Sequence, residues 1–253
     1  MLSVQHIHPE VDLGTATATG NRYCGLQQDY LCVQEFYTKE EIPHGHQQIF
    51  IAAVCDGHGI LGDKSAAYAG KALCRHLYSS TLRNKKLSAL PQEEIATHLK
   101  DAFHAGHHAA MSLYDHPPCR TAYATHGMKA PQEFDLIKGV EGGFLYRPTT
   151  GHGHDKRLEC GCTATAAIIQ GRTVSIANVG DSAAFVGGGG GASAPCHSRP
   201  ITMRHHGLNE TEADRIRQAY PGSTQVLHDA VALSLAEEQG EADNTSAIVI
   251  FFH

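Results

Sequence analysis

The strongest constraint on the fold is a pair of strand-like segments joined by a very short turn. Apolar runs and alternation predict two strands, over Thr163–Ile169 and Thr173–Val179. Gln170-Gly171, which follows the first of them, is typical of a tight hairpin turn. A turn this short pairs its two strands antiparallel, so we expect the chain to contain an antiparallel sheet.

Other segments carry equally regular patterns. Apolar runs and alternation predict further strands over Tyr30–Phe36, Ile49–Cys55 and Ser246–Phe252. Helical spacing of apolar residues predicts helices over Lys64–Tyr78, Glu93–Tyr114, a stretch that begins near Asn209, and Ala230–Glu238. Asn209 and Glu212 have the spacing of a capping box. Strand-rich ends with helices between them indicate an α+β layered domain.

Composition narrows the class of protein. The 253 residues include 20 basic and 26 acidic ones, and the net charge of −6 argues against general attraction to nucleic acid or to anionic membranes. The longest apolar runs have the length of a strand, well short of the ~20 residues of a membrane span. The first residues lack the pattern of a secretory signal, so the eight cysteines are expected to be reduced thiols. We therefore expect an intracellular, cytoplasmic protein, with an organelle or a cytoskeletal assembly left open.

Two stretches lack a regular pattern. His116–Glu159 mixes Pro, Gly and His without a sustained period, which predicts an irregular insertion. Predicted strands on both sides of it must meet in one sheet edge, so we expect residues 1–253 to form a single domain with this insertion on its surface. Gly187–Gly191 is a run of five glycines, which predicts a flexible loop.

Four aspartates each adjoin a predicted strand. Asp29 and Asp243 come just before a strand, whereas Asp56 and Asp181 follow one. Carboxylates at the ends of core strands can converge on one sheet edge, where they repel one another unless a cation neutralises them. Oxygen ligands select hard ions such as Mg²⁺ or Mn²⁺. Aspartate also begins turns at strand ends, but four aspartates in flanks this specific favour a metal site.

The residues around these aspartates form five motifs in a fixed order. The motifs are Gln28-Asp29, Asp56-Gly57-His58-Gly59, Gly161-Cys162-Thr163-Ala164, Asn178-Val179-Gly180-Asp181-Ser182 and Asp243-Asn244-Thr245. From about Gly20 to Phe252, the chain resembles the metal-dependent type-2C Ser/Thr protein phosphatase family. Gln27-Gln28-Asp29 is closest to the first motif of plant-type members. Ile201–His206, followed by Glu212–Arg217, resembles the family's stretch after the hairpin.

The resemblance implies a four-layer α-β-β-α sandwich, in which two antiparallel sheets pack together and helices flank them. It also implies a two-ion centre of Mg²⁺ or Mn²⁺ at the sheet edge. Asp56 matches the carboxylate that bridges both ions, and the carbonyl of Gly57 matches a further ligand. Asp243 matches another metal ligand, and Asp181 matches the acid associated with a weaker third ion.

Two further residues inherit catalytic roles from the resemblance. Asp29 matches an acid near the metal-bound waters, and His58 matches the proposed general acid for the leaving alkoxide. Paired cations suit phosphate esters, because they lower the pKa of a bridging water and neutralise charge on the phosphoryl oxygens. The implied substrate is a phosphoprotein.

The chain departs from the family between the last two motifs. Only 61 residues, 182–242, separate Asp181 from Asp243. The family's Ser-Asp-Gly-Leu-Trp-Asp-like segment, whose first Asp is another metal ligand, is missing, and the chain has no tryptophan. Asp229 is the only spare acid near a short apolar stretch there. The fold is therefore expected to be shortened before the last motif.

The basic residues that the family uses to bind phosphate are also missing from their usual positions in this chain. Ala183 occupies the position where the family has Arg after Gly-Asp-Ser. The basic residue expected shortly before Asp29 falls on Tyr23 or Cys24, with Arg22 close but offset. Arg22 is the candidate phosphate-binding residue.

Histidines and cysteines offer other metal sites, because the chain has 19 histidines. His152-Gly-His154 and Cys160-Gly-Cys162 can be arranged as a zinc site, although their spacing fits no common zinc knuckle. His104, His107 and His108 share one helix face. A solvated polar face explains these three histidines better than a metal does.

Two functions from different classes follow. In the first, the fold is kept while catalysis is impaired, and the protein is a pseudophosphatase that acts as a structural or regulatory subunit of an assembly. In the second, it is an active Mg²⁺- or Mn²⁺-dependent phosphoserine/phosphothreonine protein phosphatase. The missing segment and Ala183 favour the first, because loss of a ligand-bearing strand is hard to compensate. The intact Asp-Gly-His-Gly and Asp-Asn motifs favour the second.

Overall fold

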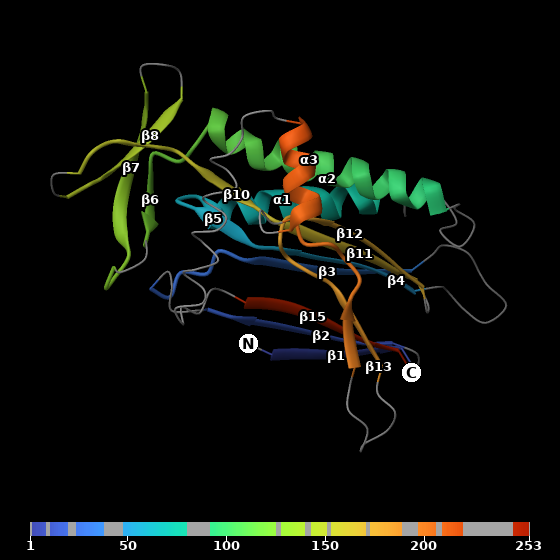
Figure 1. Cartoon of the computed structure of the whole chain (residues 1–253). Helices are drawn as coiled ribbons and strands as arrows, with labels where there is room; N and C mark the ends of the chain where they lie inside the picture. Colours follow the sequence, from blue (N-terminus) through green and yellow to red (C-terminus); the bar gives the residue numbers. More distant parts are fainter. Residues whose placement is uncertain are drawn as a thin grey trace.

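Two antiparallel sheets form the centre of the molecule in the computed structural model (Figure 1). The structure describes residues 2–8, 11–19, 24–37, 48–79, 92–124, 128–139, 143–150, 153–170, 173–188, 197–205, 209–219 and 245–252. The first sheet has the strand order β12 (Thr173–Val179), β11 (Ala164–Gln170), β4 (Gln48–Cys55) and β3 (Tyr30–Tyr37). The second has the order β1 (Leu2–His8), β2 (Val11–Ala18) and β15 (Thr245–Phe252).

The two sheets pack face to face through apolar side chains. This core joins Leu13 of β2 to Phe50 of β4 and Ile169 of β11, and Ile248 and Ile250 of β15 pack against it. Successive residues of a strand point to opposite faces, so the odd-numbered residues of β4 face the other way. These are Ile49, Ile51, Ala53 and Cys55, and they join a second core under the helices.

Helices α1 (Gly62–Leu77) and α2 (Gln92–Asp115) cover that second face of the first sheet. Leu73 and Leu77 of α1 and Leu99 of α2 are buried there. The two helices approach closely at Gly106, where an added Cβ would lie 3.1 Å from the carbonyl oxygen of Ala69. The chain therefore has the predicted α+β fold of antiparallel sheets flanked by helices. In the part of the chain that the structure describes, no helix covers the outer face of the β1–β2–β15 sheet.

Helix α3 (Glu210–Ala219) follows the hairpin region and begins where the capping pattern predicts. The backbone N–H of Glu212 donates to Oδ1 of Asn209 over 3.3 Å, and the N–H of Ala213 donates to the Asn209 carbonyl. The Asn209 side chain thereby satisfies one donor that the first helical turn leaves without an intrahelical partner, and its carbonyl accepts the first intrahelical bond.

The structure confirms the five predicted strands and three of the predicted helices. The fourth predicted helix, Ala230–Glu238, lies outside the described residues. Gln170, which was expected in the hairpin turn, instead belongs to β11 and pairs with Thr173. Strands β1 and β2 were not predicted. Gly14 and a run of Thr and Ala in β2 give little apolar alternation, and β2 is held instead by pairing with β1 and β15.

The segment predicted to be irregular contains a regular sheet. Its antiparallel strands, in order, are β6 (Arg120–Tyr123), β7 (Gln132–Lys138), β8 (Phe144–Pro148) and β9 (Lys156–Arg157). Short strands separated by Pro- and Gly-containing loops hide their alternation, which explains the error. Phe134 and Leu136 of this sheet form a core with Ile60 and Leu61, which precede α1. A single domain with a surface insertion stays a prediction.

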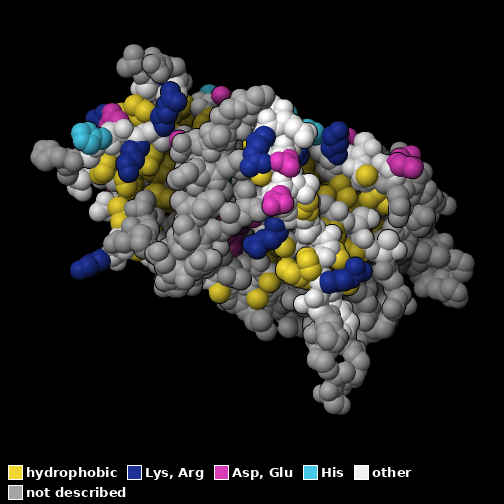
Figure 2. Space-filling view, viewed as in Figure 1, with side chains coloured by type: hydrophobic (Ala, Val, Ile, Leu, Met, Phe, Trp, Pro, Cys, Tyr) yellow, Lys and Arg dark blue, Asp and Glu magenta, His cyan; other side chains and the backbone are white. Residues whose placement is uncertain are grey.

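Part of the run of five glycines, 187–191, lies in a β-strand. Gly187 and Gly188 lie in β13 (Phe185–Gly188), which pairs antiparallel with β14 (His197–Pro200). This corrects the predicted loop at its first two residues, and residues 189–191 lie outside the described part. No helix among the described residues is long and apolar enough to cross a membrane. On the face shown in Figure 2, the described basic and acidic side chains are interspersed.

Candidate functional site

The Asp-Gly-His-Gly motif forms a short strand beside the motif that opens β11. Strand β5 (Gly57–Gly59) pairs antiparallel with β10 (Cys160–Cys162), so that His58 lies opposite Gly161. A Cβ on Gly57 would collide with the backbone carbonyls of Gly62 and Gln28. Only glycine fits this position, because the obstructing atoms are backbone. The close approach also brings the Gln28-Asp29 motif to the same place.

Asp56 is joined to the hairpin motifs through Thr163. The N–H of Asp56 donates to the Thr163 hydroxyl over 3.1 Å, and the Thr163 N–H donates to the Asp56 carbonyl over 2.8 Å. The same hydroxyl lies 2.6 Å from that of Ser182, the residue after Asp181. Three of the five motifs therefore meet at one edge of the first sheet.

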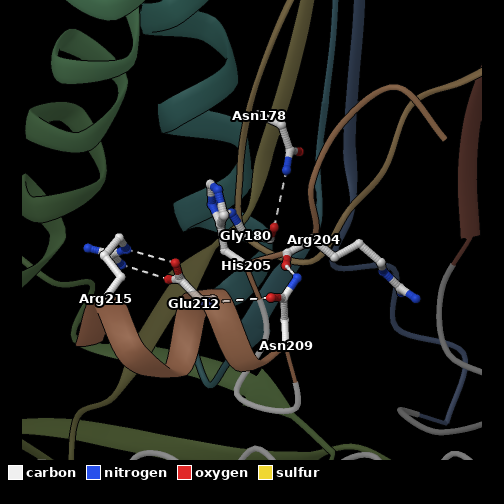
Figure 3. A network of polar contacts seen from close by, with 7 residues as sticks. All are labelled: Asn178, Gly180, Arg204, His205, Asn209, Glu212 and Arg215. Carbon is white, nitrogen blue, oxygen red and sulfur yellow. Dashed lines mark hydrogen bonds and ion pairs between the residues drawn. The ribbon is translucent and has the colours of Figure 1, made fainter. Parts of the chain in front are cut away.

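The turn that carries Asp181 depends on Gly180. Its φ of +101° lies in the left-handed region, and an added Cβ would lie 2.7 Å from the Thr163 side chain. Gly180 also exchanges two hydrogen bonds with His205: its N–H donates to His205 Nδ1 over 3.3 Å and its carbonyl accepts the His205 N–H over 2.8 Å (Figure 3). His205, in the segment that follows the hairpin, therefore stabilises this turn through these two hydrogen bonds.

Two further side chains support the same turn. Asn178 Nδ2 donates to the carbonyls of Gly180 and Met203 over 3.2 and 3.1 Å, and Arg204 Nε donates to the Asp181 carbonyl over 2.7 Å. Sequence reasoning placed Asn178 inside a motif but found no role for it, nor for Arg204 or His205. For Arg204 and His205, the resemblance of Ile201–His206 to the family's post-hairpin stretch was the available signal.

Asp29 enters the site through its neighbour Gln28. Gln28 is 3% exposed, and its Nε2 donates to the Gly59 carbonyl over 2.7 Å. Asp29 directly precedes β3, and its Oδ1 atom is buried. A carboxylate oxygen is therefore held inside the protein beside the segment that carries Asp56 and His58.

His58 lies over Gly161, where an added Cβ would be 2.7 Å from the imidazole Nε2. Partial loss of hydration lowers the pKa of His58, and the nearby carboxylates of Asp181 and Glu159 oppose this by favouring the charged form. A neutral imidazole at this edge can exchange a proton with a group bound beside it.

The described acids do not by themselves fit the two-ion centre that the motifs imply. No three His, Cys, Asp or Glu side chains among the described residues are placed to hold a metal ion. This applies equally to the His104, His107 and His108 face and to His154 with Cys160 and Cys162. The remaining candidates, Asp243, Asp229, Arg22 and His152, lie outside the described residues.

A largely apolar groove of about 720 Å³ lies next to these motifs, between α1, α2 and strands β10 and β12. Its walls include Leu99 and Phe103 of α2, and Gly161, Cys162 and Asn178 line its other side. No carboxylate is among its described lining residues, so neither Asp56 nor Asp181 lines this groove.

Comparison with known protein families identifies the family of this chain. The family model described as protein phosphatase 2C matches residues 25–235. The chain therefore belongs to the protein phosphatase 2C family. The match begins after Arg22 and ends before the Asp243-Asn244 motif.

Two solved structures show distant similarity. The PPM Ser-Thr phosphatase of Mycobacterium smegmatis, in complex with cacodylate, has 16% identity and a TM-score of 0.42, with coverage of 95% of this chain and 72% of that one. Serine-threonine phosphatase 2C of Toxoplasma gondii has 12% identity and a TM-score of 0.39, with coverage of 100% and 78%. No curated protein matches the chain.

Proposed function

We propose that this protein 2C-type chain keeps the phosphatase fold with impaired catalysis and acts as a pseudophosphatase, a structural or regulatory subunit of a protein assembly. The observation that carries the proposal is the departure from the family between its last two motifs, where residues 182–242 contain no Asp-Gly pair and no tryptophan. The family's Ser-Asp-Gly-Leu-Trp-Asp-like segment, which carries a metal ligand, is therefore missing from the 61 residues between Asp181 and Asp243.

The loss of a cation adds to the loss of a ligand. Ala183 follows the Asp181-Ser182 turn where the family has Arg, and a methyl group cannot bind a phosphoryl oxygen. Phosphoryl transfer depends almost wholly on cations placed around developing charge. Removal of a single donor from a preorganised site commonly costs ~10²–10³ in rate. Two such losses should leave turnover far below that of an intact family member.

Hydrogen bonds nevertheless join the motifs that the structure describes. Thr163 joins Asp56 to Ser182, and His205 holds Gly180 by two hydrogen bonds. A set of fixed contacts like this keeps the surface rigid for a protein partner, even in a protein that hydrolyses no substrate. We therefore propose that these contacts have a structural role rather than a catalytic one.

The alternative is an active Mg²⁺- or Mn²⁺-dependent phosphatase for phosphoserine and phosphothreonine in proteins. The observation that favours it is the intact Asp56–Gly59 motif with its close backbone packing against Gln28. Bound ions would activate a water and neutralise phosphoryl charge. In this case the ions would be held by Asp56, the Gly57 carbonyl, Asp181 and Asp243, with Asp29 nearby and His58 protonating the leaving group.

Hydrolysis of a phosphothreonine peptide by the pure full chain, over a titration of Mg²⁺ and of Mn²⁺, tests the proposal. We expect turnover no higher than that of Asp56→Asn, or a weak activity that high Mn²⁺ rescues only in part. Asp101→Asn, an exposed acid on α2, is the matched control. Turnover at the pace of an intact family member, lost in Asp56→Asn and kept in Asp101→Asn, would overturn the proposal and make Asp229 the first candidate for the missing ligand.

A further inference from the structure

Strand β3 and helix α1 pack against each other through two side-chain contacts that occur in the same order along both elements. At one end the Tyr30 ring lies over Gly70, where an added Cβ would be 2.5 Å from the ring. At the other end the rings of Phe36 and Tyr78 stack with centroids 4.5 Å apart. From Tyr30 to Cys32 the strand advances by about 6.8 Å, and from Gly70 to Cys74 the helix advances by about 6 Å, so Cys32 comes opposite Cys74 next to the Tyr30–Gly70 contact.

Cys32 and Cys74 occupy the step between these two contacts. Cys74 is 0% exposed, whereas Cys32 is partly buried and packs against the same core. The two thiols are hydrogen-bond partners of each other, and the Tyr30 hydroxyl is a second partner of Cys32. Both cysteines are free. A partly accessible thiol therefore faces a fully buried one across the strand–helix interface.

The surroundings make the two thiols unequal. The hydrogen bond with Cys74 lowers the pKa of Cys32, Tyr30 acts in the same direction, and burial opposes both. The Cys32–Cys74 hydrogen bond and burial raise the pKa of Cys74. Lys71 adds positive charge nearby, with its ammonium 5.8 Å from the Tyr30 ring centroid. Because Cys32 is the more accessible of the two thiols, we assign it as the nucleophile and the buried Cys74 as the resolving thiol, an arrangement typical of redox-sensitive pairs.

We propose that Cys32 and Cys74 form a redox-active dithiol that a hydroperoxide converts to a disulfide between β3 and α1. The Cys32 thiolate attacks one peroxide oxygen, the O–O bond breaks, and the other oxygen takes up a proton and leaves as an alcohol, or as water from hydrogen peroxide. Cys32 becomes a sulfenic acid. The Cys74 sulfur then attacks the Cys32 sulfur, the S–O bond breaks, and the Cys74 proton leaves with the hydroxyl as water. Two thiols lose two electrons, and a dithiol reductant reverses the change.

The cross-link would join elements on both sides of the candidate site. Strand β3 begins directly after Asp29, and α1 begins three residues after Gly59. The disulfide closes a loop that contains residues 33–73, so it restrains the unfolded chain. We expect oxidation to raise the Tm by about 5–10 °C. This proposal is independent of whether the protein hydrolyses a phosphate ester.

A second pair of thiols, Cys55 and Cys162, could also be oxidised, so the test must distinguish the two pairs. Cys55 and Cys162 are also hydrogen-bond partners, with Cys55 0% exposed and Cys162 on the wall of the apolar groove. Oxidation at this pair would act next to Asp56 and would be a different modification. The experiment must therefore identify which sulfurs are joined.

The reduced full chain is treated with equimolar hydrogen peroxide, alkylated, digested with trypsin without reduction, and analysed by mass spectrometry. We expect a loss of two hydrogen atoms and a cross-link between the peptides Tyr23–Lys39 and Ala72–Arg75. Fragmentation separates Cys32 from Cys24 in the first peptide. A dominant cross-link between Cys55 and Cys162, or no cross-link at all in the wild-type chain, overturns the proposal.

Variants test the order of the two steps. Cys74→Ser should leave a sulfenic acid at Cys32 that dimedone traps, and Cys32→Ser should abolish both the cross-link and the Tm shift. Cys119→Ser, at an exposed cysteine, is the matched control and should leave both unchanged. Oxidation of Cys119 faster than of Cys32 in the wild-type chain would contradict the nucleophilic role, and this measurement does not depend on whether the core variants fold.

Discussion

The hydroxyl of Thr163 lies 2.6 Å from that of Ser182 and accepts the backbone N–H of Asp56 over 3.1 Å. This single side chain therefore joins the end of β4 to the turn after β12. Its position explains how two aspartates more than a hundred residues apart in the chain come to the same sheet edge. The contact also makes the geometry of the edge sensitive to one hydroxyl group.

Thr163→Val keeps the shape of the side chain and removes this hydroxyl. Loss of a part-buried hydrogen-bonding group should lower the free energy of unfolding by about 1–3 kcal/mol. Urea denaturation measures the change. Thr97→Val, which removes an exposed hydroxyl bonded to the Glu93 carbonyl, should cost about 0.5 kcal/mol or less. Equal losses in the two variants would show that Thr163 has no special role.

Gly57→Ala should be severely destabilising. The added methyl group would collide with the carbonyl oxygens of Gln28 and Gly62, and neither backbone can yield without moving the site. We expect a loss of about 3 kcal/mol or more, measured by thermal unfolding. Gly14→Ala is the control, because nothing lies within 4 Å of a Cβ built there. A fully stable Gly57→Ala protein would contradict the close approach of the first two motifs.

The Glu212–Arg215 ion pair should make stability depend on pH in the acid range. Hydrogen bonds from Arg215 lower the pKa of Glu212, so the folded state binds this proton less readily than the unfolded state. The pair therefore stabilises the protein above the unfolded pKa of about 4.5, and this stabilisation is lost as the pH falls through the lowered folded value.

Glu212→Gln measures that contribution. Because Arg215 is 61% exposed, we expect the variant to lose no more than about 1 kcal/mol at pH 7. The difference from the wild-type protein should shrink as the pH is lowered from about 5 to 3, as followed by urea denaturation. A difference that grows on acidification would have the wrong sign for a carboxylate with a lowered pKa.

Any residual binding of Mn²⁺ should depend on Asp56 more than on any other acid, because the bridging carboxylate of the family touches both ions. Asp56→Asn keeps the shape and removes the charge, so we expect affinity to fall by about tenfold or more in a calorimetric titration. Asp101→Asn should bind as the wild-type chain does. Unchanged affinity in Asp56→Asn would point to the histidine-rich segments instead.

Helices and strands were predictable from the sequence where burial of one face produces a periodic spacing of apolar residues. Thr173–Val179 coincides with β12, and α2 extends beyond the predicted Glu93–Tyr114 by one residue at each end. Apolar residues on these elements face a core, so their spacing records the geometry of the backbone. Strand β2 lacks such a periodic spacing of apolar residues. Its place between β1 and β15 rests on backbone pairing such as that of Leu13 with Ile250, which local sequence does not record.

The sequence by itself determined the family, the order of the motifs and the departures from them, because these are properties of residue identity and spacing. Only the tertiary structure decided which residues meet: Gly57 with Gln28, Gly180 with His205, and Cys32 with Cys74. Each of these contacts joins segments at least 25 residues apart in the chain. The period of a strand or helix reports which face of a segment is buried, but the partner on that face is set by sheet register and helix packing.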